Sequence, residues 1–163
     1  MQQITKPNPP TKIGTSPMTY KVDARGMMRP SGWSPWLNTE AFGEEGKTYR
    51  ITATGTWNLN AKGGGSPIGP DGAPQNPGFD NWVDPTSNEG ALICKIGING
   101  KPFPVGSAVV TAAMCSGTDH IFYFACNDLV SNDIVSPGVY YSKQSAAYAD
   151  NAGSMLVTIQ ENS

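Results

Sequence analysis

Apolar and polar residues alternate most regularly between positions 46 and 57. Tyr49, Ile51, Ala53 and Trp57 would share one face of an extended strand, with arginine and threonine side chains on the opposite face. A period of two residues is typical of an antiparallel strand with one buried face and one face in water. We therefore predict a half-buried antiparallel strand here, with Trp57 in the core.

Three further apolar runs predict strands at 91–98, 120–126 and 155–160. The first run ends at Asn99-Gly100, a dipeptide that favours the tight turn of a β-hairpin. No segment shows the 3.6-residue period of an amphipathic helix, and 19 glycines and 14 prolines favour short strands joined by turns. The predicted fold class is all-β, a β-sandwich of two antiparallel sheets.

A chain of 163 residues is suited to one domain. Residues 1–19 are polar and rich in proline, so we expect a flexible N-terminal arm there, followed by a single domain at 20–163. The polar stretch at 58–88 has no apolar period, and a loop of this length is usually functional or flexible. Cys94 and Cys126 stand in apolar runs, which predicts that they pack in the core.

Composition excludes several classes of function. Charged residues make up 15% of the chain and the formal net charge is −2, so we expect no binding to nucleic acid or to anionic membrane surfaces. No run approaches the roughly 18 apolar residues that span a bilayer, which argues against membrane insertion. Residues 1–17 lack the apolar core of a signal peptide, so we expect a cytoplasmic location, with release to the cell surface or outside left open.

Acidic and amide side chains stand at the ends of the last two predicted strands. Asp128 follows the run at 121–126, and Asp150 and Asn151 precede the final strand. If these strands are neighbours, the three side chains converge, and their oxygens together with nearby carbonyls suit a hard cation such as calcium. We therefore predict a calcium site that can also hold a small polyol; ordinary turn chemistry of Asp and Asn is the alternative.

Over residues 46–163 the chain resembles the calcium-dependent galactophilic lectins of bacteria, the LecA type. The shared segments keep the same order along both sequences. They lie at 51–57, 69–72, 90–97, 127–128 and 148–154. The resemblance implies a β-sandwich of the jelly-roll or galactose-binding type, a bound calcium ion, binding of galactose or a related glycan, and a homo-oligomer.

Carried over by position, the family's calcium ligands fall on five residues. The resemblance assigns the shared carboxylate to Asp128, side-chain oxygens to Asp150 and Asn151, and backbone carbonyls to Asn60 and Ala147. The family usually has Asn where this chain has Asp150, and the additional negative charge favours calcium.

The sugar-contacting run of the family corresponds to 76–80 in this chain. Its histidine is replaced by Asn76, which can form hydrogen bonds, and its glutamine by Phe79, which can stack on a sugar ring. Gln75 is a neighbour able to supply the lost contact. The resemblance adds the Asp128 and Asp150 carboxylates and the Leu129 backbone to the sugar-binding set. The loop at 129–146 is longer than in the family, which predicts a reshaped or covered site.

Two other functions are compatible with the residues. One is a structural or adhesive module with a protein partner, in which calcium stiffens a loop. The other is a glycoside hydrolase with Asp128 and Asp150 as paired carboxylates. Because His120 is the single histidine and no nucleophile elbow is present, we do not expect an enzyme. Among the tryptophans, Trp82 is the candidate for exposure near a ligand.

Overall fold

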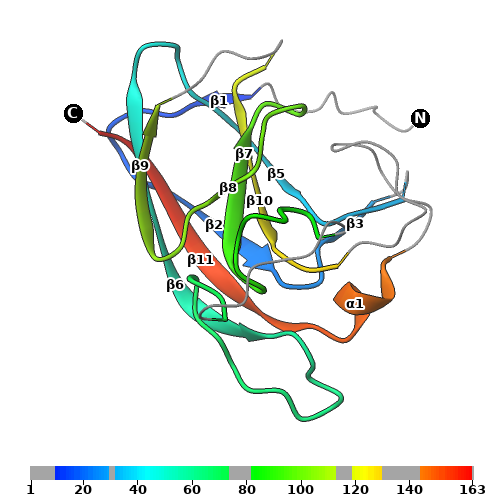
Figure 1. The fold of residues 1–163 in the computed structure, drawn as a ribbon. Coiled ribbons are helices and arrows are strands. Elements are labelled where there is room, and N and C mark those ends of the chain that lie inside the picture. The colour runs from blue at the N-terminus through cyan, green and yellow to red at the C-terminus, as the bar shows by residue number, and fades with distance from the viewer. Residues whose placement is uncertain (1–9, 30–31, 74–81, 113–118, 130–143, 163) are drawn as a thin grey trace, which may run out of the picture.

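Two β-sheets pack face to face and enclose the core, as Figure 1 shows. The computed structural model describes residues 10–29, 32–73, 82–112, 119–129 and 144–162. One sheet has the strand order β1 (Thr11–Lys12), β5 (Leu37–Phe42), β10 (Ile121–Cys126), β7 (Leu92–Ile96), β8 (Phe103–Pro104). The other has the order β2 (Met18–Asp23), β11 (Ala152–Glu161), β6 (Thr48–Asn58), β9 (Ala108–Ala112). A separate hairpin joins β3 (Met27–Arg29) to β4 (Gly32–Ser34), and α1 (Ala146–Ala149) is a single helical turn. The predicted β-sandwich is confirmed.

The alternating segment forms β6, which lies between β11 and β9. Tyr49, Ile51 and Trp57 are buried in the core, whereas Arg50 and Thr54 face solvent. The Trp57 indole N–H donates to the Gly90 carbonyl at 2.7 Å, which satisfies the one polar group of this buried ring. The prediction of a half-buried strand with Trp57 inside is confirmed.

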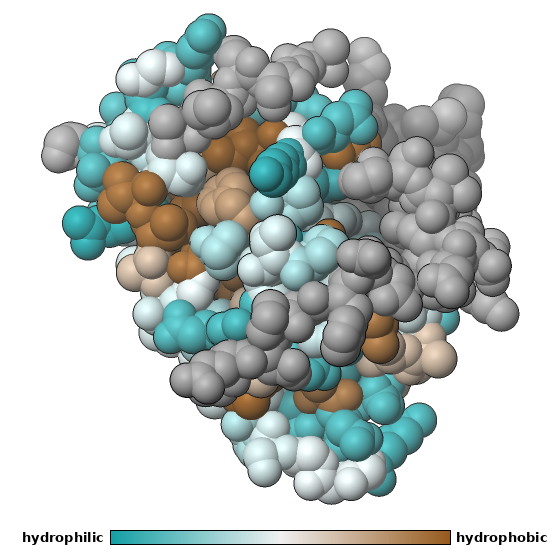
Figure 2. All heavy atoms as spheres, viewed as in Figure 1, coloured by the Kyte–Doolittle hydropathy of each residue, from teal (hydrophilic) through white to brown (hydrophobic). Residues whose placement is uncertain are grey.

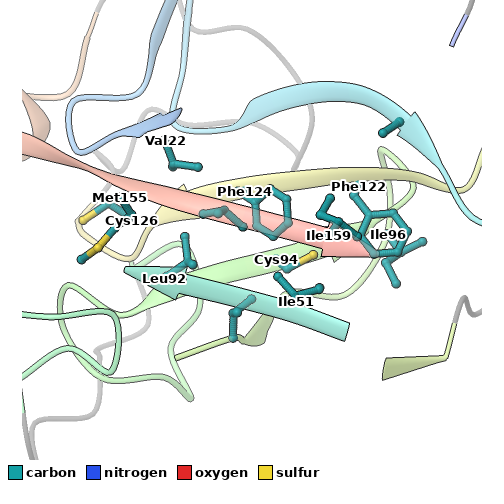
Figure 3. Close-up of a cluster of buried hydrophobic side chains, with 14 of the residues drawn as sticks. Val22, Ile51, Leu92, Cys94, Ile96, Phe122, Phe124, Cys126, Met155 and Ile159 are labelled. Carbon is teal, nitrogen blue, oxygen red and sulfur yellow. The ribbon is translucent and has the colours of Figure 1, made fainter. Parts of the chain in front are cut away.

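The apolar runs form β7 and β10, which pair with each other and are buried along their whole length, apart from Ile121 at the start of β10. Figure 3 shows their inward side chains packed against those of the facing sheet. The labelled cluster comprises Val22, Ile51, Leu92, Cys94, Ile96, Phe122, Phe124, Cys126, Met155 and Ile159. The two cysteines are core residues with free thiols, as their apolar surroundings predict.

A second apolar layer lies on the outer face of β7 and β10, where Ile93, Tyr123 and Ala125 of these strands pack with Trp36 and Ala91. Lys95 is fully buried beside this layer. Its ammonium group lies 4.7 Å from the Trp36 ring centroid and 5.2 Å from that of Tyr123, and it donates to the Ile98 carbonyl at 2.8 Å. Burial lowers the pKa of Lys95 to about 8, partly offset by the charge of Asp119. The aromatic faces supply the electrostatic partner for this buried cation.

Several elements differ from the predictions. We expected residues 1–19 to be a flexible arm, but β1 pairs with β5, Ile13 is fully buried, and β2 begins at Met18. These residues join the fold because a few apolar side chains gain burial; residues 1–9 lie outside the described part. The predicted hairpin forms between β7 and β8. Its turn differs by one residue from the expected Asn99-Gly100, because the Gly100 N–H donates to the Gly97 carbonyl and places Ile98 and Asn99 at the centre. Within the described residues, no helix is long and apolar enough to cross a membrane.

The burial pattern of β6 predicts unequal effects of truncation on its two faces. Ile51→Ala should lower the free energy of unfolding by about 2–5 kcal/mol, because it removes core methyl groups and leaves a cavity. Thr54→Ala, on the exposed face, should cost less than about 1 kcal/mol. Urea denaturation of both variants measures the difference, and equal losses would contradict the assigned faces.

Candidate metal site

Two of the predicted ligands, Asp128 and Asn151, are in contact at one end of the sandwich, and Asp150 directly precedes Asn151. Asp128 follows β10 in one sheet, and Asp150 and Asn151 lie between α1 and β11 of the other. The Asn151 side-chain amide donates to Asp128 Oδ2 at 3.0 Å. We expected neighbouring strands of one sheet; instead, the junction spans both sheets, because β10 and β11 belong to opposite layers.

Asp128 is held rigidly and almost completely buried, with 4% of its surface exposed. Its Oδ1 accepts the Leu129 N–H at 2.7 Å, and its own N–H donates to the Tyr148 hydroxyl oxygen at 3.2 Å. That hydroxyl donates in turn to the Cys126 carbonyl at 2.5 Å. The Asp128 carbonyl accepts the Val83 N–H at 3.2 Å, so both peptide groups around Asp128 are held by hydrogen bonds. The next carbonyl, that of Leu129, accepts the Ser145 hydroxyl at 2.9 Å.

Burial is the main cause that raises the pKa of Asp128 from 3.8 to about 6. The hydrogen bonds from Asn151 and from the Leu129 N–H lower this pKa in part, while the charges of Glu89 and Asp150 raise it. Burial therefore destabilises the charged form of this carboxylate, and a nearby positive charge would stabilise it.

Two buried oxygen atoms beside Asp128 accept no hydrogen bond from the described residues. They are Asn151 Oδ1 and Asp150 Oδ1. The Asn151 amide nitrogen donates both to Asp128 and to the Ala24 carbonyl, at 3.0 Å each, so the orientation of the amide is fixed and its oxygen points elsewhere. A buried acceptor without a donor is costly and needs an explanation, such as an ion.

The other two predicted calcium ligands lie nearby but differ in their suitability. The Ala61 N–H donates to the Asp150 carbonyl at 2.9 Å, which joins the turn at 60–65 to the site. However, the Asn60 carbonyl accepts the N–H groups of Gly63 and Gly65, so its acceptor capacity serves its own turn. Ala147 lies in α1, directly before the cluster.

The predicted sugar-contacting residues are only partly described. Gln75, Asn76 and Phe79 lie outside the described residues, as does most of the loop at 129–146. Trp82 was expected to be exposed near a ligand, but it is 6% exposed and forms a β-bridge with Leu129. Trp82 is therefore buried, the alternative reading for this residue, and the backbone at 82–83 pairs with the chain just beyond the end of β10.

Sequence reasoning missed the network on the other side of Asp128. The Asn127 amide donates to three carbonyls of the neighbouring loop, those of Asp84, Ser87 and Asn88, at 2.9 to 3.2 Å. Its oxygen accepts the Asp84 N–H at 2.8 Å. An apolar strand that ends in Asn-Asp was the available signal, because a buried amide needs several backbone partners.

The described donor set consists of oxygen atoms, which is the ligand type that a hard cation takes. Within the described residues, no three His, Cys, Asp or Glu side chains gather as a metal site, so a soft or borderline metal has no ligand set here. Asp128, Asp150 and Asn151 offer only oxygen, and two of those oxygens are without donors. Oxygen ligands of mixed carboxylate and amide type are those that calcium prefers.

The comparisons with known proteins support the fold. No family model matches the chain, and no curated protein sequence matches it. Among solved structures, it is similar to one described as "EclA N-terminal domain; PllA-like lectin", with a TM-score of 0.52 and 19% sequence identity. That similarity covers 88% of this chain and 95% of the other. The chain therefore has the β-sandwich fold of a lectin domain.

The raised pKa of Asp128 predicts how stability depends on pH without calcium. Since the folded-state pKa exceeds that of the unfolded chain, the folded state binds more protons between about pH 4 and pH 6, and stability falls as pH rises through that window. The loss approaches about 3 kcal/mol at neutral pH. Urea denaturation in chelator should show this slope in the native protein and in an Asp119→Asn control. It should be absent in Asp128→Asn; parallel curves for all three proteins would contradict the assignment.

Proposed function

We propose that this protein is a calcium-dependent carbohydrate-binding protein that takes galactose or a related glycan at the cluster of Asp128, Asp150 and Asn151. The observation that carries the proposal is the pair of buried oxygens without hydrogen-bond donors beside a buried carboxylate. A cation at this position would stabilise all three groups together, which hydrogen bonds from the described residues do not.

The chain's own residues would hold the ion through oxygen. Asp128 and Asp150 supply the carboxylates and Asn151 the amide oxygen, with the Ala147 carbonyl nearby; the Asn60 carbonyl is the weakest member because its turn already uses it. When bound, calcium supplies open coordination positions for two neighbouring hydroxyls of a sugar ring. The two carboxylates can also accept hydrogen bonds from those hydroxyls, which orients the ring.

Carbohydrate as the ligand is supported by two similarities, one of sequence motifs and one of fold. The ordered motifs resemble calcium-dependent galactophilic lectins, and the solved structure with the same fold is described as a lectin. A lectin requires no catalytic group, and the paired-carboxylate hydrolase has less support, because the carboxylate of Asp128 is enclosed by hydrogen bonds to Leu129 and Asn151.

One observation favours a second candidate, in which calcium only stiffens the end of the sandwich. Asp128 and Asn151 are 4% and 3% exposed, so little of either side chain reaches solvent. A buried ion would then act as a bridge between the two sheets and leave recognition to a protein partner. Asp150 is half-buried and is the member through which a sugar would reach the site.

Calcium titration of chelator-stripped protein tests the metal. We expect one site per chain, with affinity that decreases below about pH 6 because protons compete for Asp128. Asp128→Asn should weaken binding on the order of 100-fold, since it removes a negatively charged ligand. Asp119→Asn is the matched control, because Asp119 lies at the opposite end of the β7–β10 pair and should leave the affinity unchanged. If the Asp128→Asn protein binds calcium with the same heat and affinity as the native protein, the ion binds at another place.

Titration of the calcium-loaded protein with galactose and a panel of monosaccharides separates the two candidates. Binding of a sugar that disappears on chelation, and on Asp150→Ala, is the expected result for a lectin. Calcium binding with no binding of any monosaccharide, or of any glycan on an array, would favour the second candidate, a structural module that calcium stiffens.

A further inference from the structure

A cavity separate from the candidate metal site lies between the edge strands β8 and β9 and the loop that precedes β7. Its volume is about 390 Å³, which is at the lower end of the range of small-molecule pockets. Its wall contains none of the residues assigned to calcium or sugar. One side of the wall is polar and the other is apolar, so the chemistry of the two sides indicates what kind of ligand fits.

The Asp71 carboxylate belongs to the polar side and is held in place by the neighbouring backbone. Its Oδ1 accepts the Ser107 N–H at 3.0 Å. Gly106 allows this close approach, because a Cβ on that residue would lie 2.4 Å from Oδ1. The Asp71 carbonyl accepts the Asn88 side-chain amide at 3.2 Å, which joins this turn to the loop before β7. No hydrogen bond from the described residues reaches Asp71 Oδ2, so one oxygen of the exposed carboxylate is available to a ligand.

The two hydroxyl groups in the polar side have already donated their protons. Thr86 donates to Asp84 Oδ1 at 2.7 Å, and Ser87 donates to Asp84 Oδ2 at 2.5 Å. Each hydroxyl oxygen therefore retains lone pairs but has no proton for a ligand, and Thr86 is the more exposed of the two. The Asn127 amide fixes the same loop through three of its carbonyls. The polar side is thus rigid and offers mainly hydrogen-bond acceptors.

The other side of the cavity is apolar. Pro104 lies in β8, Val105 follows it, and Ala108 and Val109 begin β9. Val105 is buried and Val109 packs against the core, so this surface is continuous with the interior of the sandwich. Figure 2 shows apolar atoms gathered over β9 on the face of the molecule that also displays β8. This side would cover the apolar part of a ligand.

We propose that this cavity binds a small organic cation, a primary ammonium group on a short apolar stem. The ammonium group supplies positive charge and three donors, which match the available oxygen of Asp71 and the acceptors of Thr86 and Asn88. The stem lies against Pro104 and Val109. The described wall holds one carboxylate and no lysine, arginine or histidine, so it attracts a cation and repels an anion. A sugar fits less well, because its hydroxyl oxygens need donors in return.

Amide NMR of isotope-labelled protein, titrated with n-butylammonium chloride at constant ionic strength, tests the proposal. Chelator is present throughout, so the result does not depend on the candidate metal site or on the proposed function. We expect the backbone amide signals of Thr86, Asn88 and Ser107 to shift and to saturate at millimolar concentration. Butyrate should leave them in place, and n-butanol should bind on the order of 10-fold more weakly, because it lacks the charge.

Three variants locate the bound cation. Asp71→Asn keeps the acceptor for the Ser107 N–H but loses the charge, and should weaken butylammonium binding on the order of 10-fold. Asp119→Asn is the matched control, since Asp119 also accepts backbone N–H groups but lies outside the cavity, and it should leave the affinity unchanged. Ala108→Phe fills the cavity from β9 and should abolish the shifts.

The outcomes that would overturn the proposal are distinct from those that concern calcium. Equal affinity for n-butanol would show that the cavity takes any small apolar molecule and would overturn the assignment to a cation. The absence of saturable shifts, or binding that survives both Asp71→Asn and Ala108→Phe, would overturn the site itself. Failure of the protein to bind calcium or sugar would leave this cavity unaffected.

Discussion

The structure depends most on the burial of one carboxylate, that of Asp128, where the two sheets meet. A buried anion is costly unless it is paired or hydrogen-bonded. The surrounding chain therefore supplies hydrogen-bond donors to this carboxylate. The Leu129 N–H donates to it from its own strand end, the Tyr148 hydroxyl in α1 accepts the Asp128 N–H, and Asn151 reaches the carboxylate from the start of β11 in the opposite sheet. These contacts still leave its pKa raised to about 6, which shows that they do not fully compensate the loss of water. The cation proposed for this site would supply the remaining compensation.

The adjacent residue, Asn127, anchors the loop at 84–88, on the other side of the strand end. Successive side chains leave the end of a strand on opposite sides, so Asn127 meets the loop at 84–88 while Asp128 meets the site. The Asn127 amide makes four hydrogen bonds, all to backbone groups, and leaves that loop little freedom. The loop in turn positions Glu89, whose charge acts on Asp128. One dipeptide thus anchors the segments on both sides of the strand end.

The sequence predicted those features for which one physical effect is dominant. The alternation of β6 and the continuous apolar runs of β7 and β10 follow from burial of one face or of both, and a local pattern records this directly. β2 was not predicted, because its main determinant is pairing with β11, more than 100 residues later in the chain. The enclosure of Trp82 was missed for the same reason, since it depends on a bridge to Leu129. The site was located from its chemistry, but the orientation of the Asn151 amide depends on Ala24, a residue without any chemical signal of its own.

Recognition of a single sugar at the candidate site, as proposed above, meets a general physical limit. A sugar presents hydroxyls that water already satisfies, so replacing water at one small site yields little net affinity. Presenting two sites on one assembly makes the second binding event intramolecular, which raises the overall affinity without any new contact to the sugar.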